Sequence, residues 1–199
     1  MASSKRAEEG FSLLEVLISI VVLSIGLLGA VGMLLAAVRS TNESGSFTTA
    51  VNLVRELSEK ARINKNIAAR NNANNVYVVD DWKSGSALPS NGSDTACIGG
   101  AAACKDTDLA AWDVHTWLER VDAALPDARV AVCFDDNPFA DDGNYAWPCS
   151  KTGRNLVVKL GWTSRIPTDD EKDPAKRPPH VVMQLIPGQD YDDFAPKSF

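Results

Sequence analysis

The hydrophobic pattern of the chain begins with one long apolar run. From Val16 to Val38 there are 23 residues without a charge or a proline. A helix rises ~1.5 Å per residue, so this run can cross a hydrocarbon core of ~30 Å, and it predicts a membrane-spanning helix. Glu15 stands at the start of the run. It needs an explanation, because a charge in hydrocarbon costs roughly 2.5 kcal/mol or more unless it is paired or near the interface.

An amphipathic pattern follows the apolar run, between Phe47 and Ile67. Its apolar residues recur at spacings of three and four, and they are Phe47, Ala50, Val51, Val54, Leu57 and Ala61. We therefore expect one helix from about Phe11 to about Ile67. Its first half lies in an apolar environment, and its second half presents one apolar face to a folded head.

The pattern after this helix predicts a small α+β head. Asparagine-rich residues 71–75 end the helix, and residues 76–79 are expected to form a short strand. A second helix starts near Asp106 or Thr107, either of which can cap it, and Pro126 stops it.

Three valine-rich segments then predict an antiparallel sheet of three or four strands laid on the helix. These segments are residues 128–134, 155–163 and 180–186. In the second of them Leu156, Val158, Leu160 and Trp162 alternate and give one inward face. The charged and proline-rich residues 169–179 predict an exposed loop between the last two strands.

The cysteines point to an oxidising compartment. All four, Cys97, Cys104, Cys133 and Cys149, follow the apolar run, and an even number beyond a membrane signal favours two disulfides. Sequential pairing closes two short loops, worth roughly 2 to 4 kcal/mol each in the chain-entropy picture. Two other pairings remain open. The spacing contains no CxxC pair, which favours disulfides over zinc.

Charge and motif content argue against several functions. The net charge is -6, and no basic cluster suited to nucleic-acid phosphates is present. His115 and His180 lack an obvious ligand set. The acidic residues 135–143 break the spacing of a calcium-binding EF-hand loop, because Phe139 and Ala140 take its fifth and glycine positions. With no Walker A sequence and no convincing nucleophile, we expect no enzyme, no metal site and no cofactor.

Three interpretations compete for the N-terminal segment. A cleaved secretory signal has a shorter apolar stretch and a small-residue cleavage site, neither of which fits here. A plain signal anchor explains the length and the positive Lys5, Arg6 and Arg39, but gives Glu15 no use. The third interpretation is a retained helix that packs against copies of itself or its relatives.

The residues Gly10-Phe11-Ser12-Leu13-Leu14-Glu15-Val16-Leu17 resemble the prepilin motif of type IV pilins and pseudopilins. The resemblance implies that prepilin peptidase removes residues 1–10 by cutting between Gly10 and Phe11, and that it N-methylates Phe11. It also implies that Glu15 serves assembly, by neutralising the terminal amine of a neighbouring subunit or of its own.

The head resembles the PilV class of minor pilins. The likeness rests on residues 52–64, Cys104, Asp108-Leu109-Ala110-Ala111-Trp112, Leu125-Pro126, Cys133 and residues 157–162. It implies a subunit that primes pilus assembly in a tip complex with other minor pilins, beside the major pilin and often a large adhesin-like partner.

The expected organisation is therefore a leader at residues 1–10, a membrane and filament-core helix at 11–38, its amphipathic continuation at 39–70, and a periplasmic head at 71–199. The helix anchors the chain in the inner membrane until assembly. Two alternatives stay open, namely a pseudopilin of a type II secretion system and a membrane-anchored periplasmic binding or sensing domain.

Overall fold

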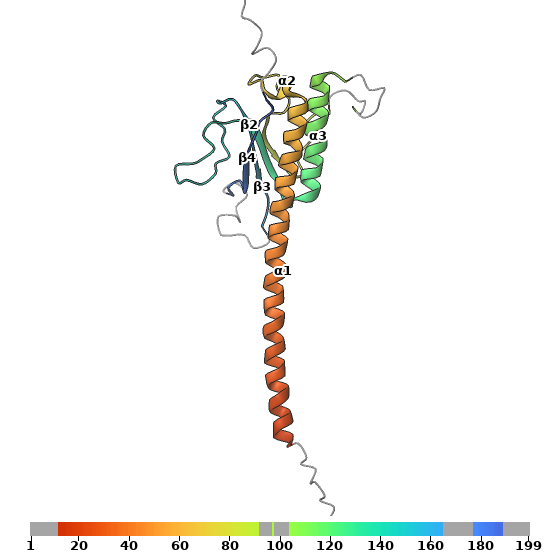
Figure 1. The fold of residues 1–199 in the computed structure, drawn as a ribbon, viewed down its shortest axis with the longest axis vertical. Helices are drawn as coiled ribbons and strands as arrows, with labels where there is room; N and C mark the ends of the chain where they lie inside the picture. Colours follow the sequence, from red (N-terminus) through yellow and green to blue (C-terminus); the bar gives the residue numbers. More distant parts are fainter. Residues whose placement is uncertain (1–11, 92–96, 98–103, 165–176, 189–199) are drawn as a thin grey trace, which may run out of the picture. The chain divides into compact units, whose positions relative to one another are not determined.

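The computed structural model describes residues 12–91, 97, 104–164 and 177–188. It divides into two compact units, Met1–Asn42 and Glu43–Phe199, and the division falls inside the first helix. That helix, α1 (Leu13–Ile63), is 51 residues long (Figure 1).

Helix α1 ends earlier than the amphipathic pattern predicts. Asn64 leaves helical geometry, with φ -104° and ψ 47°, and the short helix α2 (Lys65–Ala68) follows it. The Asn64 side chain is buried and its Nδ2 donates a hydrogen bond to the carbonyl oxygen of Asp106, 2.6 Å away. The expected helix end at Ile67 is therefore wrong by four residues, because Asn64 turns inward to a partner on another element.

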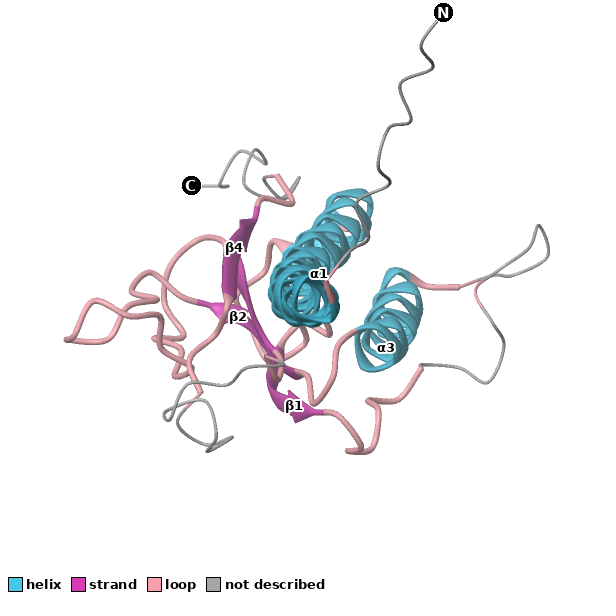
Figure 2. Cartoon of the chain, turned by 90° about the horizontal axis from the view of Figure 1, so that it is seen from below, coloured by secondary structure: helices cyan, strands magenta, loops and turns pink. Residues whose placement is uncertain are grey.

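The second unit is a four-stranded antiparallel sheet that has the part of α1 from Glu43 onward and α3 (Asp106–Ala124) on one face (Figure 2). The strands are β1 (Val79–Lys83), β2 (Arg129–Phe134), β3 (Leu156–Gly161) and β4 (Val181–Leu185). Their order in the sheet, β1-β2-β3-β4, is their order in the chain. Three strands lie inside the predicted segments, and the predicted α+β class with a long N-terminal helix is confirmed.

The first strand differs from its prediction, residues 76–79. Asn75 Oδ1 accepts a hydrogen bond from the Tyr77 amide, and the Asn75 carbonyl accepts one from the Val78 amide, so this stretch is a turn. Pairing with β2 begins at Val79 and continues across a register irregularity to Lys83. β1 is an edge strand, and an edge strand tolerates exposed acids. These acids interrupt the apolar alternation by which a strand is recognised in a sequence, so the sequence pattern did not predict β1 correctly.

Two further expectations need correction. Asp106 is the first residue of α3 and Lys105 takes the cap position, without a side-chain capping bond. The predicted exposed loop 169–179 lies mostly outside the described residues, and its last part is not exposed, since Arg177 and Pro179 are buried. Arg177 is held against the protein because its carbonyl oxygen accepts a hydrogen bond from Trp147 Nε1 at 2.6 Å.

The core of the second unit lies between the helices and the sheet. Four residues of the predicted apolar stripe on α1 are buried, namely Ala50, Val54, Leu57 and Ala61. Phe47 was wrongly included, since it is 50% exposed, and Leu53, which the stripe left out, is buried. Facing them are apolar side chains of α3, led by Trp117, and of the strands, such as Val132 and Val158. Burial of this apolar surface is the main stabilising contribution to the head.

Candidate functional site

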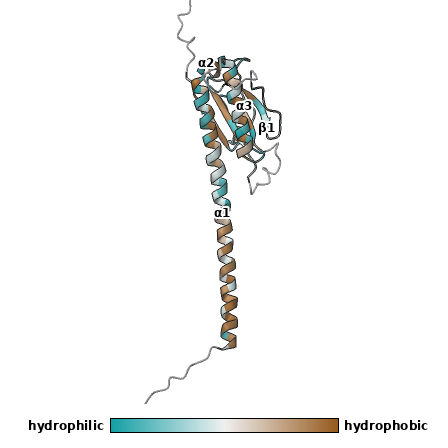
Figure 3. Ribbon diagram, turned by 90° about the vertical axis from the view of Figure 1, so that its right-hand side faces the viewer, coloured by the Kyte–Doolittle hydropathy of each residue, from teal (hydrophilic) through white to brown (hydrophobic). Residues whose placement is uncertain are grey.

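The apolar part of α1 is exposed along its whole length. Its large side chains from Leu13 to Val38 are between 46% and 90% exposed, and the most apolar window has a mean hydropathy of 2.6 with 0% of it buried. Figure 3 shows the hydrophobic colour concentrated in this part of α1. Such a surface is unfavourable in water, so this helix has the length and composition of a segment made for lipid or for other apolar helices.

Glu15 lies in the first turn of α1. The Glu15 amide donates to the carbonyl of Ser12 at 3.0 Å, and the Ser12 hydroxyl accepts from the Leu14 amide at 3.3 Å, so Ser12 caps the helix. A carboxylate in the first turn is favoured by the positive end of the helix dipole. Glu15 is the sole charged residue between Leu13 and Val38. Gly10 and Phe11, the predicted cleavage and methylation site, lie outside the described residues.

The polar atoms of the apolar segment are satisfied within the helix. The hydroxyls of Ser19 and Ser24 each donate to the carbonyl four residues earlier, at 2.7 Å, and Thr41 does so at 2.9 Å. In an apolar environment an unpaired hydroxyl costs several kcal/mol, and these bonds remove that cost. Glu15 is thus the group whose burial demands a partner outside the helix.

Gly26, Gly29 and Gly32 have no packing role within the described chain. A Cβ placed on any of them meets no atom within 4 Å outside the local helix backbone. Each costs the helix roughly 0.5 to 1 kcal/mol relative to alanine. No contact among the described residues offsets this cost.

A buried polar network fastens the C-terminal part of α1 to the head. Asp113 on α3 accepts hydrogen bonds from Lys60 Nζ on α1 and from the Tyr77 hydroxyl, both at 2.9 Å. Burial, followed by the Asp113 charge, raises the pKa of Tyr77 far above its ordinary value, so its hydroxyl stays protonated and donates. Trp117 Nε1 also donates to the Leu53 carbonyl at 2.8 Å. These contacts make the end of α1 part of the head.

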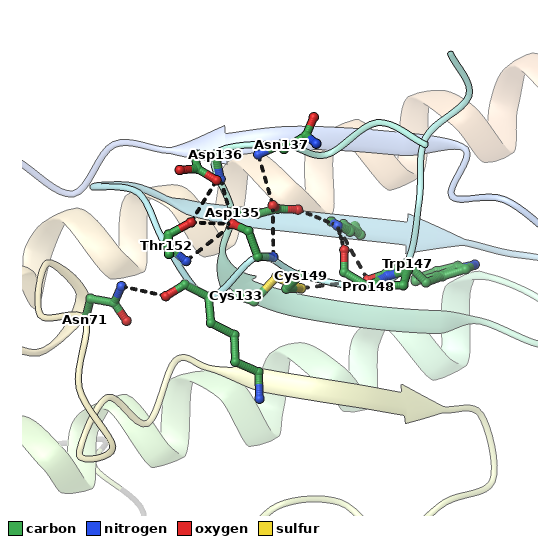
Figure 4. Close-up of a disulfide and its surroundings, with 12 residues drawn as sticks. Asn71, Cys133, Asp135, Asp136, Asn137, Trp147, Pro148, Cys149 and Thr152 are labelled. Atoms are coloured by element: carbon green, nitrogen blue, oxygen red, sulfur yellow. Dashed lines mark hydrogen bonds and ion pairs between the residues drawn. A yellow bond between two sulfur atoms is a disulfide. The ribbon is translucent and has the colours of Figure 1, made fainter. Parts of the chain in front are cut away.

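The disulfides join Cys97 to Cys104 and Cys133 to Cys149, which is the sequential pairing. The second one holds the segment between β2 and β3 against the outer face of the sheet, where Figure 4 shows it beside Asp135, Trp147 and Pro148. Its sulfurs are bonded to each other, so the nearby set Cys133, Asp135 and Cys149 offers no thiolates for a metal.

Lys159 is a fully buried lysine beneath this segment. Its Nζ lies 2.5 Å from Asp135 Oδ2 and donates to the Pro148 carbonyl at 2.7 Å, and both charged side chains are 0% exposed. Burial acts to raise the pKa of Asp135, but the Lys159 ammonium and the amides of Ser150 and Asn137 hold it below its ordinary value. The pair closes the outer face of β3, whose residues are all buried.

The remaining predicted residues are engaged by protein partners. The Nδ1 atom of His115 lies 2.7 Å from the Pro89 carbonyl, and the His180 ring packs 4.5 Å from that of Trp162. In the acidic segment, Asp136 accepts a hydrogen bond from the Thr152 hydroxyl at 2.8 Å. The Tyr77, Lys60 and Asp113 network has no sequence signature, whereas a lysine inside the apolar strand Leu156–Gly161 is a signal that could have been noticed.

Two family models match adjoining parts of the chain. Residues 5–31 match the prokaryotic N-terminal methylation motif, and residues 32–115 match the family described as type IV pilin Tt1218. No curated protein and no solved structure matches the chain. The first match contains Glu15, and the second runs from the apolar part of α1 into α3. These matches show that residues 5–115 are similar to type IV pilins, and the long N-terminal helix, the antiparallel sheet, the second helix and the two disulfides agree with a type IV pilin-like fold.

Proposed function

We propose that this chain is a minor pilin of the PilV class, which primes type IV pilus assembly within a tip complex of minor pilins. The observation that carries the proposal is the exposed apolar part of α1 with Glu15 in its first turn. A lipid anchor alone needs the apolar surface and gains nothing from the acid. A helix that docks beside another subunit uses both the apolar surface and the acid.

The chemistry of docking follows from the position of the acid. Cleavage between Gly10 and Phe11 creates an amine at residue 11, four residues before Glu15. A carboxylate and an amine brought together in an apolar packing core offset much of each other's desolvation, while either alone is unfavourable. The helix first holds the chain in the inner membrane and then packs into the filament, with the head in the periplasm.

Leader removal is the first test. Replacing Gly10 with a bulky residue should prevent cleavage by prepilin peptidase, because the residue before the scissile bond no longer fits. Intact-mass analysis of protein recovered from membranes reads the result, with Ala7→Val in the same leader as the control. Normal processing of the Gly10 variant contradicts the proposal.

Incorporation is the second test. Glu15→Ala and the isosteric Glu15→Gln should both reduce recovery with pilus tips, because neither side chain carries the negative charge that would pair with a terminal ammonium group. The head should stay folded, as judged by tryptophan fluorescence. Glu59→Ala, which removes an acid 65% exposed on the same helix, serves as the control. Unchanged recovery of both Glu15 variants contradicts the role of the acid, and recovery with a secretion complex in place of pili supports the pseudopilin alternative.

A further inference from the structure

A hairpin of residues 138–146 projects from the head between β2 and β3. Phe139 and Tyr145 face each other in it across an antiparallel bridge, and backbone hydrogen bonds of 2.8 and 3.0 Å lie on either side of this pair. The segment extends from the sheet on the side away from α3, as the teal trace in Figure 1 and the view in Figure 2 both show. The hairpin is therefore an ordered projection of the head.

Both ends of the hairpin are fixed. At its tip the Gly143 amide donates to the Ala140 carbonyl at 2.9 Å, and Gly143 has a φ of +81°, which suits glycine. At its base the disulfide between Cys133 and Cys149 joins the two segments that lead into it. A surface that is held in one conformation loses little entropy when it binds. The hairpin is thus pre-organised for contact with a partner.

The two aromatic rings of the hairpin are stacked on each other and open to solvent. Their centroids lie 5.2 Å apart, with an angle of 24° between the ring planes. Phe139 is 50% exposed and Tyr145 is 39% exposed, whereas Trp117 and Trp162 of the same head are buried. In the part of the chain that the structure describes, no cationic side chain is stacked on either ring of the hairpin. Each ring therefore keeps accessible surface for a partner.

The hairpin and its flanks carry negative charge that the chain does not compensate. Residues 135–150 contain four aspartates and no lysine, arginine or histidine. Three of these aspartates, Asp136, Asp141 and Asp142, are exposed and have no basic partner among the described residues. Asp142 accepts instead from the backbone and side-chain nitrogens of Asn144, at 2.9 and 3.0 Å. These bonds lower the pKa of Asp142, so its carboxylate stays ionised.

The rings and the carboxylates together select an arginine. Asp141 follows Phe139 by two residues and Asp142 precedes Tyr145 by three, so the acids and the rings share one small surface. An aromatic face attracts a positive charge, and a carboxylate binds a guanidinium through two hydrogen bonds. Arginine serves both better than lysine, because its planar group stacks on a ring and still presents donors to an acid.

Charge also favours a partner other than a second copy of this chain. Two copies repel each other, since each has a net charge of -6. The exposed Arg62 and Arg120 of this chain are already paired with Glu59 and Glu56. We propose that the hairpin of residues 138–146 binds an arginine on the head of a neighbouring subunit of a different, more basic kind. This inference rests on the proposed function, because it gives the head of a minor pilin a specific contact within the tip complex.

The test uses the full-length chain in uncharged detergent micelles and three acetylated, amidated peptides, read by isothermal titration calorimetry at low salt. Gly-Arg-Gly-Arg-Gly should bind. The peptide with citrulline in place of both arginines keeps their shape but lacks their charge, and it should bind about ten-fold more weakly or worse. The peptide with lysine in both places should bind about three-fold more weakly, because an ammonium group lacks the planar stacking surface.

Two double variants locate the site. Asp141→Asn with Asp142→Asn removes both charges and keeps side chains that suit a turn, and it should weaken binding of the arginine peptide about ten-fold or more. Asp80→Asn with Asp122→Asn makes the same change at exposed acids of β1 and α3, and it should alter the affinity by less than about two-fold. The two variants change the net charge equally, so a difference between them reports the position of the charge.

The ring is tested separately. Phe139→Leu keeps an apolar side chain and removes the aromatic face, so it should weaken binding of the arginine peptide about three-fold and abolish the preference over the lysine peptide. Absence of binding, equal affinity for the arginine and citrulline peptides, or equal affinity of the two double variants overturns the proposal. A dimer in sedimentation velocity that Asp141→Asn with Asp142→Asn dissociates also overturns it, because the occupant is then a second copy.

The outcome is separable from that of the proposed function. A chain that is cleaved after Gly10 and recovered with pilus tips, yet binds the three peptides alike, keeps its function as a minor pilin and loses the arginine site. A chain that binds the arginine peptide through Asp141 and Asp142, yet is neither cleaved nor recovered with tips, keeps the arginine site and loses the pilin function.

Discussion

The buried pair of Lys159 and Asp135 gives the sharpest prediction about the head. Lys159→Met keeps the length and most of the volume of the side chain, so it tests charge and hydrogen bonding more than packing. The substitution removes an ion pair in which both side chains are 0% exposed, and also the hydrogen bond from Nζ to the Pro148 carbonyl. The head should become less stable because Asp135 is then a buried charge without a cation.

The size of the expected loss of stability depends on the hydrogen bonds that Asp135 keeps in the Lys159→Met variant. Breaking one side of a buried pair typically costs 3 to 5 kcal/mol. Asp135 Oδ1 still accepts from the amides of Asn137 at 3.1 Å and Ser150 at 3.2 Å, and these bonds soften the loss. We expect a decrease of about 3 kcal/mol in the free energy of unfolding. Adding Asp135→Asn removes the stranded charge while keeping an acceptor, and it should recover about half of that loss.

Tryptophan fluorescence during guanidinium titration of the full chain in micelles measures the effect. All five tryptophans lie in the unit Glu43–Phe199, so the signal reports the head and not the apolar helix. Lys151→Met, at an exposed lysine in the same inter-strand segment, should change stability by less than about 0.5 kcal/mol. A loss below about 1 kcal/mol for Lys159→Met, or a double variant no more stable than the single one, would refute the reasoning.

Three further predictions concern the same head. Tyr77→Phe should cost about 1 to 3 kcal/mol, because the buried Asp113 carboxylate loses a donor, and the same guanidinium titration measures it. Replacing Cys133 and Cys149 together by alanine should cost about 2 to 4 kcal/mol and expose the segment between them to limited proteolysis, whereas intact protein resists it. Because the pKa of Asp135 is lowered in the fold, its contribution is present above the unfolded pKa of about 4 and is lost as pH falls through the lower folded pKa. Fluorescence-monitored acid titration should therefore show wild type losing stability below about pH 4 more steeply than Asp135→Asn, and parallel curves would contradict this.

The features that repeat along the chain were predictable. The spacing of Ala50, Val54, Leu57 and Ala61 identified the buried face of α1, and the valine-rich segments located β2, β3 and β4. These patterns are local, because each position is set by the period of its own helix or strand. The long N-terminal helix followed from the same kind of signal, and it is the part of the candidate site that the sequence described best.

Features that depend on distant partners were not predictable. Asn64 ends α1 because its side-chain amide donates a hydrogen bond to the carbonyl oxygen of Asp106. No property of the neighbouring residues predicts that contact. Strand β1 carries two exposed acids and pairs only because β2 lies beside it. The same is true of Tyr77, whose hydroxyl finds Asp113 across 36 positions of sequence. Each of these is a tertiary effect that overrides a local preference.

The sheet order has a consequence for how the head is made. Because β1, β2, β3 and β4 pair in the order in which they are synthesised, each of β2, β3 and β4 has its first neighbour in the sheet already present when it emerges. Pairings between successive segments keep loop-closure entropy low and favour rapid folding. The apolar face of α1 around Leu57 is synthesised first, however, and its burial is complete only when the whole sheet has formed. A nascent chain that stops before β4 therefore exposes part of the apolar face of α1. Until β4 is synthesised, the head is most prone to aggregation and to binding by a chaperone.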